Sequence, residues 1–153
     1  MTLADGSYTI SGLTPGDYTI TPALPGYAFT PDTRLETIVA TDLTSVDFTG
    51  EPVYSVSGVI LDGTANGVAG VEVSDGEGYF AITDENGEYT VVGLPAGSYT
   101  LTPTKTGYTY TPVSQPVTLV DMDISGIDFT PSLAEIFSIS GTILDSALAG
   151  VPG

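Results

Sequence analysis

Residues 86–103 read NGEYTVVGLPAGSYTLTP, and residues 5–22 read DGSYTISGLTPGDYTITP. The two stretches share their glycines, tyrosines and closing proline, and each position lies 81 residues after its counterpart, as Asn86 lies after Asp5. The match continues to the end of the first copy, where residues 46–49 (VDFT) return as residues 127–130 (IDFT). A repeat of this length is too long for a stacking solenoid unit and suits a small domain with its own core.

A second repeated stretch shows where one domain ends and the next begins. Residues 54–62 (YSVSGVILD) return as residues 137–145 (FSISGTILD), with the spacing now 83. We therefore expect residues 1–52 to be the C-terminal part of a β-sandwich repeat, residues 53–133 a complete repeat, and residues 134–153 the opening strand of a further repeat. This division is that of a window cut from a longer tandem array.

Short alternating runs separated by turn residues predict an all-β fold, a tandem antiparallel β-sandwich, Ig-like, with about seven strands per repeat. Tyr54, Val56 and Ile60 alternate with polar or small neighbours, which indicates a strand with one face inward. Asn86-Gly87 predicts a tight type I′ hairpin after which residues 88–92 pair back. We expect Tyr99 to be buried with Leu101 and to donate its hydroxyl to the backbone. Glu51-Pro52-Val53 and residues 131–136 are expected to be proline-stiffened connectors.

The charge of the chain is strongly acidic, with 19 Asp and Glu against two Lys and Arg and a formal net charge of −17. Nucleic acids and anionic membranes require clustered basic side chains, so we expect neither as a partner. Cysteine and histidine are both absent, which excludes disulfides, thiolate or imidazole metal sites, and Ser-His-Asp or Cys-His catalysis. No apolar run reaches membrane-spanning length. We expect no enzyme activity.

The complete repeat resembles the carboxypeptidase regulatory-like domains, and is similar to the Cna B-type and SdrD B-like repeats, all prealbumin-like surface domains. The resemblance rests on residues 83–89 (TDENGEY), 93–99 (GLPAGSY) and 107–112 (GYTYTP). It implies a non-catalytic spacer, stalk or adhesin module of a bacterial or archaeal surface protein. The Lys-to-Asn isopeptide bond of some Cna B-type domains is not expected, because the strand from Val56 to Leu61 contains no Lys.

Acidic residues near the turns provide the candidate metal ligands. Asp84, Asn86 and Glu88 offer oxygen atoms at alternate positions, as calcium loops do, but turn chemistry explains the same residues without a metal. We expect no cofactor, with calcium at this turn as a weak candidate. Asp123 and Asp128 recur as Asp42 and Asp47, which favours a repeated loop cap or turn former.

Two readings of the function remain open. The first is a structural repeat of an extracellular stalk, adhesin or surface filament, whose partners are adjacent repeats or copies of itself. The alternative is a carbohydrate- or protein-binding module of a secreted protein, in which Tyr108 and Tyr110 stack on a glycan. An exposed aromatic platform would favour the alternative.

The stretch after the complete repeat supplies a candidate assembly strand with Phe137, Ile139 and Ile143 on it. Unpaired strands are marginal in water, so we expect the strands at both ends of the chain to be paired with something. Adjacent repeats of one chain or a second copy could provide that pairing. In the second case, β-strand complementation would join copies head to tail.

Overall fold

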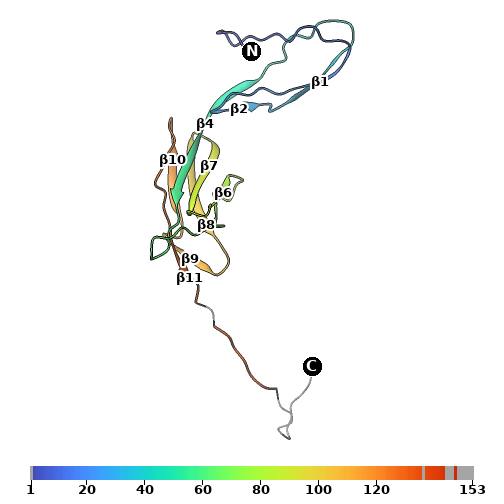
Figure 1. The fold of residues 1–153 in the computed structure, drawn as a ribbon. Helices are drawn as coiled ribbons and strands as arrows, with labels where there is room; N and C mark the ends of the chain where they lie inside the picture. Colours follow the sequence, from blue (N-terminus) through green and yellow to red (C-terminus); the bar gives the residue numbers. More distant parts are fainter. Residues whose placement is uncertain (1, 136, 144–146, 148–153) are drawn as a thin grey trace.

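The computed structural model describes residues 2–135, 137–143 and 147, and contains no helix among them, hence none that could cross a membrane. An N-terminal unit, a central unit and an extended C-terminal tail follow one another in an elongated arrangement (Figure 1). The strands are β1 (Gly16–Ile20), β2 (Tyr27–Thr30), β3 (Arg34–Ile38), β4 (Thr49–Val59), β5 (Glu72–Ser74), β6 (Phe80–Ile82), β7 (Glu88–Pro95), β8 (Gly97–Thr104), β9 (Tyr108–Thr111), β10 (Gln115–Leu119) and β11 (Thr130–Leu133).

The central unit is a sandwich of two sheets. One sheet has the order β10-β8-β5-β6, and the other places β4 between β2 and β7, with β9 and β11 forming a further antiparallel pair. The core lies between the sheets and is made of twelve buried apolar side chains: Val56, Ile60, Val71, Val73, Tyr89, Val91, Leu94, Leu101, Tyr110, Val117, Leu119 and Phe129. The predicted all-β sandwich is therefore confirmed, and the alternation in residues 54–60 does place Val56 and Ile60 inward.

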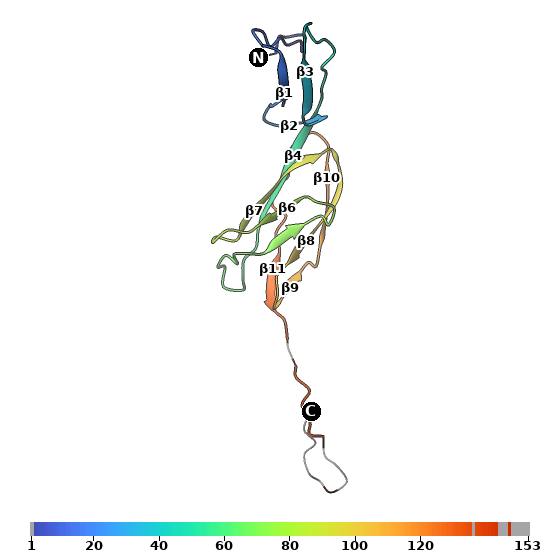
Figure 2. The ribbon, with the colours of Figure 1, turned by 90° about the vertical axis from the view of Figure 1, so that its right-hand side faces the viewer.

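Strand β4 joins the two units without a loop. Its first part pairs with β2 of the N-terminal unit, from Thr30↔Thr49 to Tyr27↔Pro52, and its second part pairs with β7 of the central unit. Figure 2 shows β4 running from one unit into the other. The prediction that Glu51-Pro52-Val53 is a connector is wrong, because these residues continue the β4 ladder. The predicted boundary between residues 52 and 53 lies inside this strand.

The N-terminal unit repeats the strand pairing of the central unit residue for residue. Gly16↔Ile38 in the β1–β3 pair corresponds to Gly97↔Leu119 in the β8–β10 pair, and Tyr27↔Pro52 corresponds to Tyr108↔Leu133. The N-terminal unit differs from the central unit in its packing, since no residue from 2 to 50 is buried. The predicted division into repeats at residues 1–52, 53–133 and 134–153 stays a prediction.

The turn at residues 84–88 differs from the predicted type I′ hairpin. Gly87 has a positive φ of 76°, but Asn86 does not, and a type I′ turn needs both. Strand β7 does not pair back onto β6; it pairs with β4 in the opposite sheet. The turn therefore carries the chain from one sheet of the sandwich to the other.

Candidate functional site

The second part of β4, residues 53–59, lies in a slot between two segments of the central unit. On one side β7 pairs with it antiparallel, with Val56 opposite Val91 and Gly58 opposite Tyr89. On the other side residues 123–129 run parallel to it. The Ile124 carbonyl accepts the Ser57 N–H at 2.9 Å, and the Ile127 N–H donates to the Ser57 carbonyl at 3.1 Å. We call residues 88–94 and 123–129 the filled slot.

Two carboxylates hold β4 in the filled slot. Asp123 accepts a hydrogen bond from the backbone N–H of Ser55 at 2.7 Å, and Asp128 accepts one from the N–H of Val59 at 2.9 Å. Hydrogen bonds to a charged acceptor are stronger than neutral ones. The sequence showed that these aspartates recur, but the predicted role as local turn formers is wrong, because their donors lie 68 and 69 residues away along the chain.

Tyr89 and Gly58 fix the fit of β4 in the filled slot. The Tyr89 hydroxyl donates to the carbonyl of Ile127, which ties the two sides of the slot together. Burial, and secondly the charge of Asp128, raises the pKa of Tyr89 above its usual value, so the hydroxyl stays protonated and able to donate. A Cβ on Gly58 would lie 2.0 Å from the Ile127 carbonyl oxygen. The slot therefore leaves no room for a side chain at residue 58 and requires glycine there.

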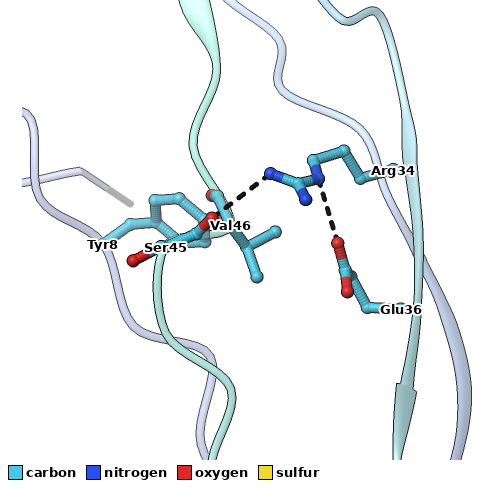
Figure 3. Close-up of polar contacts among 5 residues, drawn as sticks. All are labelled: Tyr8, Arg34, Glu36, Ser45 and Val46. Carbon is cyan, nitrogen blue, oxygen red and sulfur yellow. Dashed lines mark hydrogen bonds and ion pairs between the residues drawn. The ribbon is translucent and has the colours of Figure 1, made fainter.

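The N-terminal unit contains the counterpart of this slot without a strand in it. Residues 7–13 correspond to 88–94 and residues 42–48 to 123–129, and we call them together the open slot. The Tyr8 hydroxyl donates to the carbonyl of Val46 at 2.6 Å, as Tyr89 does to Ile127 (Figure 3). Residues 7–13 have a sequence like that of β7 but form no strand.

The three candidate calcium ligands lie on the turn between β6 and β7. The Asp84 carboxylate accepts the backbone N–H groups of Asn86 and Glu88, both at 2.9 Å, so it caps the turn. Within the described part of the chain, no group of three or more acidic side chains is close enough together to hold a metal ion. The geometry gives Asp84 a structural role, and calcium binding at this turn stays a prediction.

Tyr108 and Tyr110 do not form an open aromatic platform. Tyr110 is buried, with 7% of its surface exposed, and half-buried Tyr108 packs against the core. The ammonium of Lys105 lies 5.4 Å from the Tyr108 ring centre and donates to the carbonyl of Ala69 at 2.6 Å. Lys105, Tyr108 and Tyr110 line a hollow of about 540 Å³, where the Lys105 ammonium lies over the Tyr108 ring that a sugar would need.

The candidate assembly strand is fully exposed. Phe137, Ile139 and Ile143 have 87%, 103% and 77% of their surface exposed, and residues 137–143 form no strand. The expected pairing is with an adjacent repeat or a second copy, and it stays a prediction. The rest of the predicted opening strand, residues 136 and 144–146, lies outside the described residues.

Tyr99 makes the hydrogen bond that the sequence predicts but is less buried than expected. Its hydroxyl donates to the Pro95 carbonyl at 2.8 Å, which confirms the predicted backbone hydrogen bond, and Tyr18 makes the equivalent bond to Thr14. The predicted full burial is wrong, because Tyr99 is only partly buried, edge-on against Tyr79. Leu101, expected beside it, is fully buried.

The fold and the slot define a β-sandwich module whose first strand is clamped between two backbone segments. The carboxypeptidase regulatory-like domain matches residues 55–132, and the chain belongs to this family, whose domains are non-catalytic modules. Chitinase ChiA of Flavobacterium johnsoniae is 34% identical over 149 residues, which cover 94% of this chain but 9% of the chitinase. The chain thus spans less than a tenth of that relative.

Two solved structures also resemble the chain. A chain of a type II cohesin–X-dockerin complex from Acetivibrio cellulolyticus is 26% identical, with a TM-score of 0.37 over 50% of this chain and 56% of that one. A minor pilin of Streptococcus agalactiae is 17% identical, with a TM-score of 0.40 over 92% of this chain and 69% of the pilin.

Proposed function

We propose that this chain is a non-catalytic structural segment of an extracellular stalk, adhesin or surface filament of a bacterium or archaeon, built from tandem β-sandwich repeats. Its partners are neighbouring repeats or copies of itself. Its surface, with a formal charge of −17, suits neither nucleic acid nor anionic membrane. In this proposal residues 1–52, 53–133 and 134–153 belong to three consecutive repeats.

The observation that carries the proposal is the shared strand β4. Two units that share one continuous strand cannot rotate freely, because rotation would break the β2–β4 or the β4–β7 ladder. The matching registers of the two units indicate that the same joint can recur at every repeat. An array of such joints is a stiff spacer, which is what a stalk requires.

The similarity to a chitinase supports a setting in a secreted protein, where a module of this kind could also bind a glycan or a protein. The covered ring of Tyr108 and the buried ring of Tyr110 weigh against glycan stacking at the predicted pair. We therefore propose the structural role, and saturable binding of a glycan would contradict it.

Small-angle scattering of the whole chain, measured at low concentration, tests the stiffness of the joint. Inserting Gly-Ser-Gly-Ser between Pro52 and Val53 should turn the profile of a rigid elongated particle into that of two units moving independently. The same insertion between the exposed residues Asp121 and Met122 is the control and should leave the profile unchanged. Identical profiles for all three chains, or saturable binding on a glycan array, would contradict the proposal.

A further inference from the structure

Two Asn-Gly dipeptides of the central unit pack against each other. Asn66-Gly67 lies in the loop that precedes β5, and Asn86-Gly87 lies in the turn between β6 and β7. A Cβ on Gly67 would lie 2.0 Å from the carbonyl carbon of Asn86, and a Cβ on Gly87 would lie 3.0 Å from the Cα of Gly67. The φ of Gly67 is not positive, so this close contact, and not a turn conformation, requires glycine after Asn66.

An asparagine followed by glycine carries its own reactive group. The backbone nitrogen of the glycine attacks the side-chain Cγ of the asparagine and loses its proton. Glycine has no side chain to hinder this approach. A C–N bond forms, the side-chain nitrogen leaves as ammonia, and a five-membered succinimide ring results. Water then opens the ring at one of its two carbonyls, which gives aspartate or isoaspartate. The reaction needs no enzyme, only a mobile side chain and a free N–H on the glycine.

Asn86 is held so that this attack is blocked. The Gly87 N–H donates to the Asp84 carbonyl at 3.0 Å, and the Gly87 carbonyl accepts the N–H of Ile60 at 2.8 Å. The N–H of Asn86 itself donates to the Asp84 carboxylate at 2.9 Å. The attacking nitrogen is therefore already bonded, and both sides of Gly87 are fixed within the fold.

Asn66 lacks these restraints on its side chain and on the nitrogen that follows it. Its side chain is exposed, and the carboxamide nitrogen donates to the hydroxyl of Thr64, itself exposed, at 2.7 Å. The N–H of Gly67 donates no hydrogen bond to any residue that the structure describes. The attacking nitrogen at this dipeptide is therefore free, in contrast to that of Gly87.

The loop around Asn66 is also suited to local opening. Residues 63–66 are all exposed, and Ala65 has a φ of 62°, a conformation that a residue with a side chain rarely adopts. The Asn66 backbone is bonded to Asp62 through its N–H and its carbonyl. Hydrogen bonds in an exposed loop open locally at low cost. Such opening lets the Asn66 side chain and the Gly67 nitrogen meet.

We infer that Asn66 is a site of spontaneous modification, at which the folded chain forms a succinimide and then isoaspartate, while Asn86 stays intact. This goes beyond the proposed function and does not depend on it. The product has one more negative charge, and its main chain is one carbon atom longer within residue 66. The N–H of Val68, close to this point, donates to the carbonyl of the core residue Ile60 at 2.9 Å, so the longer main chain disturbs the edge of the core.

Peptide mapping of the folded chain during storage in mildly alkaline buffer measures this reaction, with electron-transfer fragmentation to distinguish isoaspartate from aspartate. Asn66 should convert at least about 10-fold faster than Asn86, a difference of about 1.4 kcal/mol in activation free energy. In concentrated urea the two asparagines should react at similar rates, because each is followed by glycine. The unfolded chain is thus the control for the effect of the fold.

Matched variants test the effect on stability. Stored wild-type chain that carries isoaspartate should unfold at a lower urea concentration than the fresh chain. Asn66→Gln stored in the same way should show no such loss, because glutamine would have to form a six-membered ring, which closes far more slowly. Freshly made Asn66→Asp has the added charge without the longer main chain and should unfold like the fresh wild type.

Equal conversion of Asn66 and Asn86 in the folded chain, or an Asn66 that reacts in urea but stays intact in the folded chain, would overturn this inference. Aspartate without isoaspartate at residue 66 would indicate direct hydrolysis and would also overturn it. A stored chain with isoaspartate and an unchanged unfolding midpoint would contradict the disturbance of the core edge. None of these outcomes bears on the stiffness of the β4 joint.

Discussion

Gly58 of β4 packs directly against the backbone wall of the filled slot. Its Cα faces the Ile127 carbonyl so closely that even a methyl group must displace backbone. The same residue returns as Gly141 in the repeated stretch.

Gly58→Ala should therefore lower the free energy of unfolding of the central unit by about 3 kcal/mol, the cost of overpacking where the neighbour is backbone. Chemical denaturation followed by tyrosine fluorescence measures the loss. Gly63→Ala is the control, because a Cβ there meets nothing within 4 Å and the φ of Gly63 is not positive. Equal stability of the two variants would contradict the steric account.

Asp62 is a second residue whose role can be measured directly. Its carboxylate accepts the N–H of Asn66 and both the hydroxyl and the N–H of Thr64, and these bonds lower its pKa from 3.8 to about 2. A lowered folded-state pKa stabilises the fold above the unfolded value of 3.8, and that contribution is lost as the pH falls through about 2.

Carbon-detected NMR should therefore place the titration midpoint of the Asp62 carboxyl near 2. Thr64→Val removes the hydroxyl donor and should move the midpoint up toward 3.8. A wild-type midpoint at or above 3.8 would show that the turn does not stabilise the charged carboxylate.

At the scale of elements, β4 depends on segments far away in the sequence. Its position in the sandwich is fixed by β7 on one side and by residues 123–129 on the other. On that second side the Asp128 carboxylate accepts the backbone N–H of Val59. The aspartates are thus part of the strand pairing and not of the local turns.

Asp128→Ala should cost about 2 kcal/mol of unfolding free energy, because it removes a charged acceptor and leaves the Val59 N–H without its partner. Thermal or urea unfolding of the whole chain measures this change. Asp121→Ala is the matched control from the same segment, since Asp121 is exposed and its carboxylate accepts no hydrogen bond from the described part of the chain. Similar losses from both variants would mean that the hydrogen bond between Val59 and Asp128 does not stabilise the fold.

The sequence was enough to predict the elements, but not how the elements pair across the sandwich. Alternation identified the inward positions Val56 and Ile60, and Leu101 was also predicted to be buried, because alternation along a strand is a local signal. The turn at Asn86-Gly87 was assigned the wrong type, since a type I′ turn is favoured by the dipeptide alone while the real turn must cross to the other sheet. Pro52 suggested a linker, although proline is tolerated where a strand needs no hydrogen-bond donor.

The candidate site was predicted less well, for a physical reason. The recurrence of Asp42 and Asp47 as Asp123 and Asp128 was visible, but a carboxylate that accepts from a strand 68 residues away leaves no local signature. The strand expected at Phe137, Ile139 and Ile143 is not formed in the single chain, and it stays a prediction because strand pairing needs a partner segment.

At the scale of the whole molecule, the two units differ in completeness and should differ in local stability. The central unit buries twelve apolar side chains, whereas residues 2–50 bury none. Amides that open without disturbing a core exchange their hydrogens quickly.

Hydrogen exchange read by mass spectrometry should therefore show strong protection in β4, β7 and β8 and fast exchange in residues 7–13 and 137–143 at low protein concentration. Exchange in residues 7–13 as slow as in β7 and β8 would contradict this difference between the units.

The shared strand β4 also decides how the molecule responds to tension. In the proposed array, a pull along the chain would enter the central unit through residues 49–52 and leave through β11 at its far end. The antiparallel bonds between β4 and β7 lie across the strand, and therefore across the pull. These hydrogen bonds are therefore loaded in shear and must break together, and not one after another. A cell-surface fibre made of such units would hold under sudden traction in flowing water and give way one whole domain at a time.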